Sequence, residues 1–200
     1  IPNPQSPMIS LLKNNSAIDS WTSTTSVHQI SGLESGEYTL KVTETPEGYL
    51  TPSDITFTIA SDGTITTTAT TTTDESGNKT FIFEFEKTKI QVKAVKESDN
   101  SALASVKIQI LDSESTVRES WTSTTENHSV EGLIAGKEYT IKITEVPTGY
   151  EIPENITFKI ATDGKVTSTG DMTNDGVLLV SISEVVTPTT YTVAYDVNGG

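Results

Sequence analysis

The sequence predicts an all-β protein built from two tandem β-sandwich domains. Three observations support this fold class. The chain repeats itself with a period of about 100 residues, apolar and polar residues alternate with a period of two, and no window of a dozen residues shows a sustained helical pattern. A repeat of this length is a domain rather than a solenoid unit, so we expect two similar domains in series.

The repeat is clearest in the stretches "GLESGEYTLKVTETPEGY" and "GLIAGKEYTIKITEVPTGY", which begin at Gly32 and Gly132. The hexapeptide "SWTSTT" also occurs twice, from Ser20 and from Ser120, and a histidine follows each copy. We expect the repeated aromatic residues to fill the two cores, because a Trp or Tyr on a strand usually packs inward. The matched residues are Trp21 and Trp121, His28 and His128, Tyr38 and Tyr139, and Tyr49 and Tyr150.

Alternation of apolar and polar residues places the strands along the chain. In residues 55–59 and 156–160, Ile, Phe and Ile alternate with polar residues, which is typical of a strand with one buried and one wet face. An Asp-Gly pair follows each of these runs and indicates a hairpin turn. Further runs with the same period predict strands at residues 81–86, 90–94, 106–110 and 191–197.

The two copies differ at their ends. Residues 88–106 precede the second copy and supply its first strand, whereas the first apolar run of copy one, "MISLL", matches the second strand of copy two. The first domain therefore lacks its first strand, and Tyr191, Val193, Tyr195 and Val197 form a spare strand after the second domain. "IPNPQSP" at the start has no signal-peptide pattern. We expect domains at residues 1–87 and 88–187 and a C-terminal strand within residues 188–200.

Charge and composition argue against several classes of function. The chain carries 13 basic and 27 acidic residues, a net charge of −14, whereas nucleic-acid binding needs clustered Lys and Arg. It contains no cysteine, so neither disulfides nor thiolate metal sites form. No apolar run approaches the roughly 18 residues that a membrane helix needs, so we expect no membrane insertion.

The two stretches from Gly32 and Gly132, with the Trp and His before them and "ITFxIxxDG" after them, resemble the CnaB-type (prealbumin-like) domains of bacterial surface proteins and pilins. The resemblance covers most of both repeats. It implies an Ig-like or prealbumin-like β-sandwich of seven to eight strands, used as an extracellular stalk or fibre module on the cell surface.

Many domains of this family carry an isopeptide bond, in which a Lys of the first strand attacks an Asn or Asp of the last, helped by a buried Glu. The resemblance places the Glu at Val42 and Ile143, where both residues are apolar. The Lys position falls on Ala94 or, with a slip, on Lys96, and the last strands offer no Asn or Asp at the expected place. We therefore expect neither domain to form the bond.

Other chemistry finds little support in the sequence. His28 and His128 lie near Ser and Thr, but the carboxylate that a catalytic triad needs is Asp19 in one copy and Glu119 in the other. Each copy has a single His and the chain has no Asp-x-Asp-x-Asp-Gly loop, so we expect no enzyme, no cofactor and no metal, although a weak surface calcium site stays open. Glycosylation is possible at Asn14, Asn78, Asn127 and Asn155.

Two functions remain. In the first, the chain is a structural subunit of an extracellular filament or stalk, and Tyr191–Val197 of one copy completes the first domain of the next, which gives an open head-to-tail homo-oligomer. In the second, the 200 residues are stalk repeats taken from a long cell-surface adhesin whose ligand site lies elsewhere. There the missing strand lies upstream, and residues 191–200 open another domain.

Overall fold

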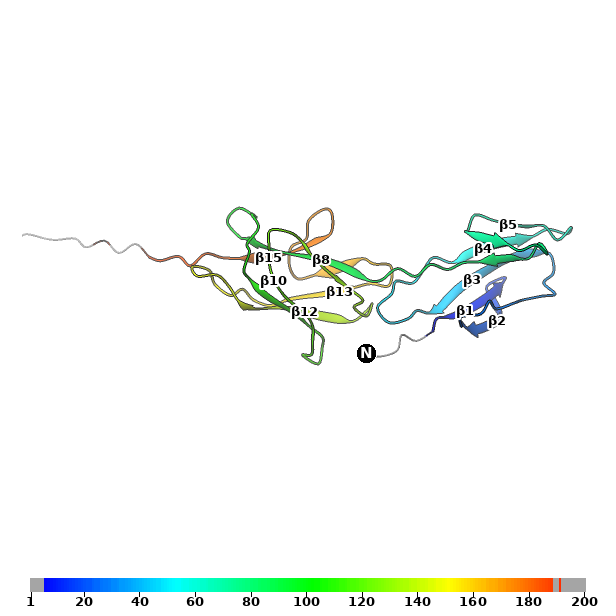
Figure 1. The fold of residues 1–200 in the computed structure, drawn as a ribbon, viewed down its shortest axis with the longest axis horizontal. Helices are drawn as coiled ribbons and strands as arrows, with labels where there is room; N and C mark the ends of the chain where they lie inside the picture. The colour runs from blue at the N-terminus through cyan, green and yellow to red at the C-terminus, as the bar shows by residue number, and fades with distance from the viewer. Residues whose placement is uncertain (1–5, 189–190, 192–200) are drawn as a thin grey trace, which may run out of the picture.

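A computed structural model describes residues 6–188 and 191, and these residues form strands and turns with no helix (Figure 1). Two β-sandwich domains lie end to end, as the sequence predicts. The donor-strand residues Val193, Tyr195 and Val197 lie outside the described residues. The strands of the first domain are β1 (Met8–Lys13), β2 (Ser16–Thr22), β3 (Gly36–Glu44), β4 (Ile55–Ile59), β5 (Ile65–Thr67), β6 (Thr71–Thr73) and β7 (Lys79–Phe81).

The second domain repeats most of this order. Its strands are β8 (Lys89–Lys96), β9 (Lys107–Leu111), β10 (Val117–Thr122), β11 (His128–Glu131), β12 (Glu138–Glu145), β13 (Ile156–Ile160), β14 (Val166–Ser168) and β15 (Val177–Ile182). One five-stranded antiparallel sheet recurs in both domains, with the order β2-β1-β3-β4-β5 in the first and β10-β9-β12-β13-β14 in the second. Alternation explains its two faces: Tyr38, Leu40 and Val42 of β3 are buried, and Glu37 and Lys41 are exposed.

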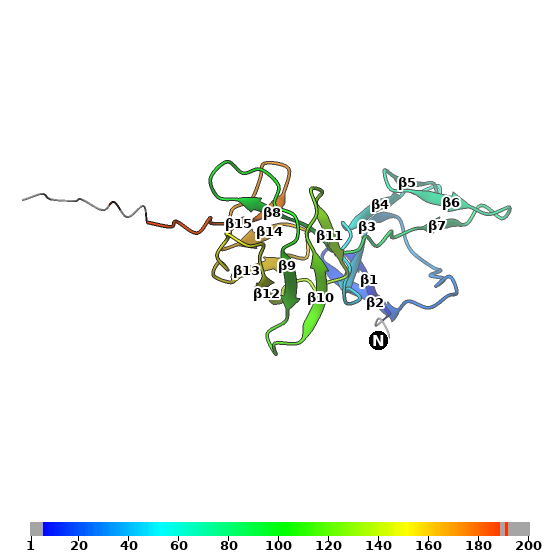
Figure 2. The ribbon, with the colours of Figure 1, turned by 60° about the vertical axis from the view of Figure 1, so that its left-hand side comes forward.

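The second sheet distinguishes the two domains. In the second domain it has three strands in the order β11-β8-β15, with β8 in the centre, antiparallel to β11 and parallel to β15. In the first domain the described residues contribute only the short hairpin β6-β7 to this side (Figure 2). No described strand of the first domain takes the place of β8.

The strand predicted at residues 81–86 is wrong beyond Phe81, since β7 ends there. The bridges Tyr49–Lys87 and Tyr150–Glu184 align the two repeats, so that Phe81 corresponds to Leu178 in β15. In the second domain β15 is a strand because it pairs with β8 along six residues. Residues 82–86 have the same alternating pattern but no central strand to pair with, and a strand needs that ladder.

The cores reflect the difference between the sheets. The second domain has 17 buried core residues, including Ile90, Val92 and Ala94 of β8. The first domain has seven, and its remaining apolar residues, among them Phe81, Phe83 and Phe85, are only partly buried. The first domain thus has the same outer sheet but a core that is covered on one side only.

The two domains meet at Thr88, which is completely buried just before β8. Its backbone N–H donates to the carbonyl of Gly48 at 2.9 Å, and its carbonyl accepts from the N–H of Gly132 at 3.0 Å. Its hydroxyl donates to the carbonyl of Leu133 at 2.5 Å. Gly48 has a φ of +82° and lies so close to the second domain that a Cβ there would be 2.7 Å from the Gly132 oxygen. Only glycine fits this position.

Two further contacts complete the junction. The N–H of Thr51 donates to the carbonyl of Thr162 at 3.0 Å, and Leu50 packs against Gly164, where a Cβ would lie 3.2 Å from the Leu50 Cδ1 atom. These hydrogen bonds define one orientation of the domains, because each pairs a backbone donor of one domain with a backbone acceptor of the other. The junction therefore fixes an extended, end-to-end arrangement.

Candidate functional site: an open groove in the first domain

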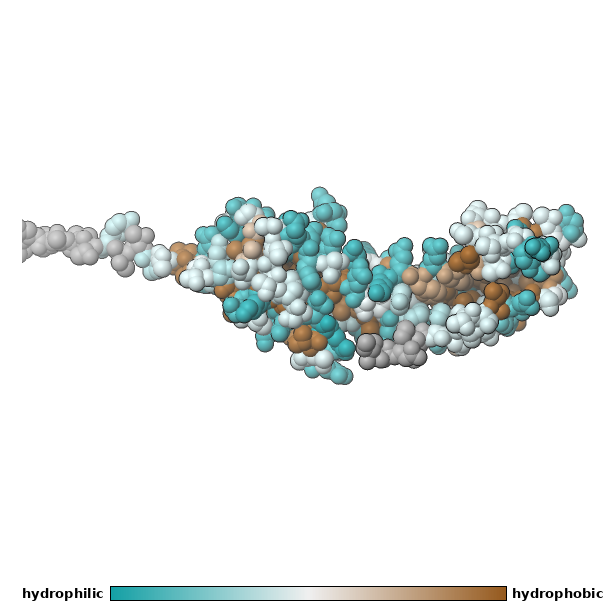
Figure 3. Space-filling view, in the orientation of Figure 1, coloured by the Kyte–Doolittle hydropathy of each residue, from teal (hydrophilic) through white to brown (hydrophobic). Residues whose placement is uncertain are grey.

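A cavity of about 500 Å³ opens along the first domain where the second domain holds β8. Its floor consists of side chains from the five-stranded sheet, Leu11, Leu40 and Phe57 among them. One wall is the segment with His28 and Ile30, and the opposite wall is residues 79–83 together with Phe85. Hydrophobic side chains reach the surface of this domain, on the right in Figure 3.

In the second domain, the strand β8 occupies the position that corresponds to this groove. Residues His128–Glu131 pair with one edge of β8 and Val177–Ile182 with the other. The walls of the groove are the counterparts of these two strands, since His28 matches His128 and Phe81 matches Leu178. The groove therefore lies between the counterparts of the two strands that flank β8 in the second domain.

The groove leaves apolar groups in water. Val27 is 66% exposed and Ile82 is 38% exposed, and both line the groove. A fully buried side chain of this size contributes about 1.5–3 kcal/mol relative to an exposed one, so an occupant that covers several of them gains substantial free energy. An open strand position also presents backbone donors and acceptors that can pair with an added strand.

A Trp–His–carboxylate group lies at the groove edge. The ring of His28 stacks on Trp21 with centroids 4.1 Å apart, and its Nε2 is 2.9 Å from Oδ2 of Asp19. The second domain repeats the arrangement: His128 stacks on Trp121 at 4.2 Å, and its Nε2 is 3.2 Å from Oε1 of Glu119. The sequence interpretation discounted a carboxylate partner because Asp is replaced by Glu, but both side chains reach the ring.

In the second domain this group lies where β11 pairs with β8. In the described residues, no hydroxyl nucleophile is hydrogen-bonded to either His ring, and no group of three or more His, Cys, Asp or Glu residues could hold a metal ion. His128 pairs directly with Val92 of β8, so the stacked ring marks the edge along which the central strand runs. In the first domain, His28 lines the groove at the corresponding position.

The hydrogen bond from His28, followed by that from the Ser20 N–H, holds the pKa of Asp19 below its ordinary value. A lowered carboxyl pKa contributes stability above the unfolded-state pKa, and this contribution is lost as the pH falls through the folded-state value. We expect Asp19→Asn to lower the stability of the first domain by less than about 1 kcal/mol at neutral pH, because the pair is exposed.

The measurement is thermal unfolding between pH 3 and 7. The difference between Asp19→Asn and the unchanged chain should shrink toward pH 3. Glu84→Gln removes the same charge from an exposed position and serves as the control. A difference that is independent of pH, or equal in both variants, would contradict the role of the pair.

The other residues singled out in the sequence take the following places. Tyr38 and Tyr139 are buried, at 1% and 3% exposure, and stack on Phe57 and Phe158. Trp21, Trp121 and Tyr150 are partly buried against the cores, and Tyr49 is half-buried. Tyr191 is 84% exposed.

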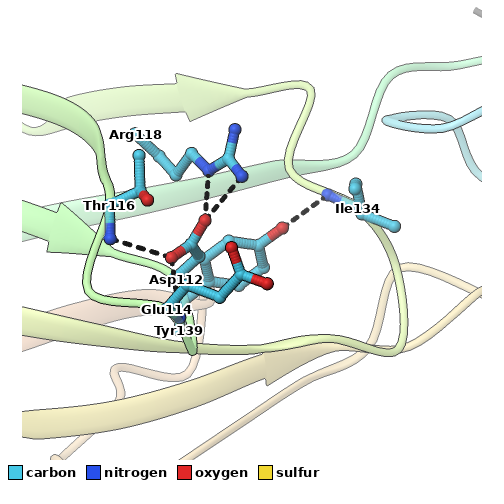
Figure 4. Close-up of polar contacts among 6 residues, drawn as sticks. All are labelled: Asp112, Glu114, Thr116, Arg118, Ile134 and Tyr139. Atoms are coloured by element: carbon cyan, nitrogen blue, oxygen red, sulfur yellow. Dashed lines mark hydrogen bonds and ion pairs between the residues drawn. The ribbon is translucent and has the colours of Figure 1, made fainter. Parts of the chain in front are cut away.

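Polar contacts hold the turn between β9 and β10 and the neighbouring corner at Tyr139 (Figure 4). Asp112 accepts hydrogen bonds from the N–H of Thr116 at 2.9 Å and from Nε of Arg118 at 2.7 Å, and these contacts hold the pKa of Asp112 below its ordinary value. The hydroxyl of Tyr139 accepts from the N–H of Ile134 at 2.9 Å, and burial raises its pKa. Both sets of contacts stabilise a turn or a corner, which is a structural role.

The positions implied for an isopeptide bond in the second domain are Ile143 and either Ala94 or Lys96, and Lys96 is only partly buried. Ala94, Ile143 and Val180 are buried there in one core, and Ala94 lies beside Val180 in the β8–β15 pair. That the bond does not form stays a prediction.

In the part of the chain that the structure describes, no helix is long and apolar enough to cross a membrane.

Several solved structures are similar to the chain. A C-terminal fragment of the pilus adhesin SpaC from Lactobacillus rhamnosus GG is 18% identical, with 92% of this chain and 91% of that chain covered and a TM-score of 0.47. The shaft pilin SpaA from the same organism is 12% identical, with 92% and 87% covered and a TM-score of 0.41. The Bacillus anthracis TIE protein is 16% identical, with 91% and 31% covered and a TM-score of 0.44.

A comparison with curated proteins found no match. The family model described as SpaA, prealbumin-like fold domain, matches the chain twice, at residues 8–74 and 88–175. These two ranges cover most of the chain and fall on the two β-sandwich domains, as the sequence resemblance implies. The chain therefore belongs to the SpaA prealbumin-like fold domain family.

Proposed function

We propose that the chain is a non-enzymatic structural module of an extracellular pilus, fibre or stalk. The family membership supports this proposal, and so does the similarity to a shaft pilin and a pilus adhesin. The observation that carries it is the groove of about 500 Å³, which is lined by apolar side chains and by the counterparts of the strands that flank β8. The proposed domains are residues 1–87 and 88–187, followed by a strand within residues 188–200.

The proposed occupant of the groove is the strand Tyr191–Val197 of a second copy. Its Tyr191, Val193, Tyr195 and Val197 alternate with smaller or polar residues, as Ile90, Val92 and Ala94 do in β8. Alternate apolar side chains would enter the groove, and the backbone would pair with both walls.

The polarity of the strands agrees with a head-to-tail assembly. By analogy with the β15–β8 pair, an occupant runs parallel to residues 81–86, from the free end of the first domain toward the junction. The segment that follows β15, where the tail begins, leaves the second domain at the opposite end of the molecule, on the left in Figure 1. A donor at one end and an acceptor at the other generate an open chain of subunits rather than a closed dimer.

The test is deletion of residues 188–200. The full chain should form concentration-dependent polymers, measured by light scattering and electron microscopy, and the shortened chain should stay monomeric. Val193→Asp with Tyr195→Asp should have the same effect as the deletion. Thr192→Asp with Ala194→Asp, on the outward face of the same strand, is the matched control and should still assemble. Polymers formed by the shortened chain would refute the proposal.

A second candidate is a stalk segment of a longer adhesin. The observation that favours it is β8 itself, because this first strand of the second domain belongs to the same chain as the rest of the domain and directly precedes it. A segment preceding Ile1 in a longer chain would fill the groove in the same way. A full chain that stays monomeric at every concentration, while the groove still binds an added strand peptide, would favour this candidate.

A further inference from the structure

The free end of the second domain repeats the surface that the first domain uses at the internal junction. Gly149 corresponds to Gly48, and Val185 corresponds to Thr88. The N–H of Thr88 donates to the Gly48 carbonyl at 2.9 Å, and the N–H of Val185 donates to the Gly149 carbonyl at 2.8 Å. The neighbouring bond from Leu50 to Glu86 likewise recurs between the next pair of counterparts. The backbone of the two ends is thus the same.

One of these two equivalent ends is covered and the other is open. Thr88 is completely buried, whereas its counterpart Val185 is 44% exposed. Beside it, Val186 is 87% exposed and Ile152, the counterpart of Thr51, is 56% exposed. Val185 and Ile152 thus lie exposed on the second domain where their counterparts in the first domain take part in the interface, and Val186 extends this apolar surface.

The complementary surface is also present twice. At the junction, the second domain contributes Gly132 with Leu133, and Thr162 with Gly164. At the free end of the first domain the counterparts are Gly32 with Leu33, and Ser61 with Gly63. The backbone conformations agree, because φ is +73° at Gly32 and +78° at Gly132.

We propose that the open end of the second domain docks on the free end of the first domain of a second copy, in the geometry of the internal junction. The contact surface consists of Gly149, Ile152, Val185 and Val186 on one copy and of Gly32, Leu33, Ser61 and Gly63 on the other. The choice of a second copy of this chain as the docking partner rests on the proposed head-to-tail assembly. A tail that leaves Val185 then enters the groove of the next copy as β8 enters the second domain after Thr88.

Two differences make this contact weaker than the internal one. Val185 lacks the hydroxyl with which Thr88 donates to the Leu133 carbonyl. Glu151 stands where Leu50 packs on Gly164, and in the docked copy it would lie near Asp62, a like charge. Docking should therefore be reversible, and it should strengthen with salt as the repulsion is screened.

The test uses cysteine pairs, because the chain has no cysteine of its own. Thr51→Cys with Thr162→Cys is the internal standard: a backbone hydrogen bond of 3.0 Å joins these residues, and a short bismaleimide should link them within one chain. Ile152→Cys with Ser61→Cys is the equivalent pair across two copies. We expect it to give a ladder of dimers, trimers and longer products on a denaturing gel.

Glycine variants provide a second measurement. A Cβ at Gly149 meets no described atom within 4 Å in the single chain, but in the docked pair it would meet the Gly32 carbonyl as a Cβ at Gly48 would meet Gly132. Gly149→Ala should therefore abolish the ladder. Gly176→Ala, at a similar φ of +83° and in open space, has the same backbone strain and should keep it.

The outcomes separate this inference from the proposed function. Polymers that depend on residues 188–200 but give no ladder would overturn end docking and leave strand donation intact. A ladder that persists after deletion of residues 188–200 would support end docking alone. A chain in which the internal standard links but neither polymers nor a ladder form overturns both.

Discussion

In a chain shortened to residues 1–187, we expect two thermal transitions, with the first domain unfolding well below the second. The five-stranded sheets of the two domains are equivalent, but 17 residues are buried in the second core and seven in the first. A stability deficit of about 2 kcal/mol corresponds to roughly 8–16 °C in Tm for domains of this size, so the transitions should be resolved by calorimetry.

A synthetic peptide of residues 188–200 should raise only the lower transition. A ligand that binds the folded domain at 100 times its Kd adds about 2.7 kcal/mol, which amounts to a shift of roughly 10–20 °C. A peptide with Val193→Asp and Tyr195→Asp is the control and should leave both transitions unchanged. A single transition in the shortened chain, or equal shifts with both peptides, would show that the groove is not an incomplete strand position.

Gly48→Ala should release the first domain from its fixed orientation on the second. The added Cβ would lie 2.7 Å from the Gly132 oxygen and 3.1 Å from the Gly132 Cα, so backbone must move, and the hydrogen bonds of Thr88 across the junction would be lost. Small-angle scattering and residual dipolar couplings of the shortened chain should show a broad range of interdomain angles in place of one.

The second repeat supplies a matched control for this substitution. Gly149→Ala changes the same turn at a similar φ, +92° against +82°, and its Cβ meets no described atom within 4 Å. Both variants carry the strain of a side chain at positive φ, about 1–2 kcal/mol. Only Gly48→Ala should change the interdomain angle. If the two variants behave alike, the close approach at Gly48 does not hold the domains together.

The alternating pattern predicted strands well where both neighbours of the strand are present. Residues 55–59 and 156–160 form β4 and β13 as expected, because each lies between two partners of a complete sheet. Residues 82–86 carry an equally regular pattern and form no strand. Alternation with a period of two indicates which face of a segment is apolar. A strand also needs hydrogen-bonded neighbours, and whether they are present depends on the whole fold.

The site was only partly visible in the sequence. The repeat offset predicted that the first domain lacks a counterpart of β8, and a groove could be inferred from this prediction. The carboxylate partners of the histidines were discounted because one is Asp and the other Glu, although Asp19 and Glu119 each precede a Trp by two residues and so share its face of the strand. The role of Thr88 could not have been predicted, because a single Thr among many gives no signal until two domains close around it.

The parallel pairing of β8 and β15 has a mechanical consequence. The chain enters the second domain at one end through β8 and leaves at the other through β15, and six consecutive residues of each strand lie side by side. A tensile load along the molecule therefore pulls the two strands past each other, so the hydrogen bonds between them share the force and must break together. On the proposed assembly, the first domain gains the same resistance to shear when the strand of a second copy occupies the groove.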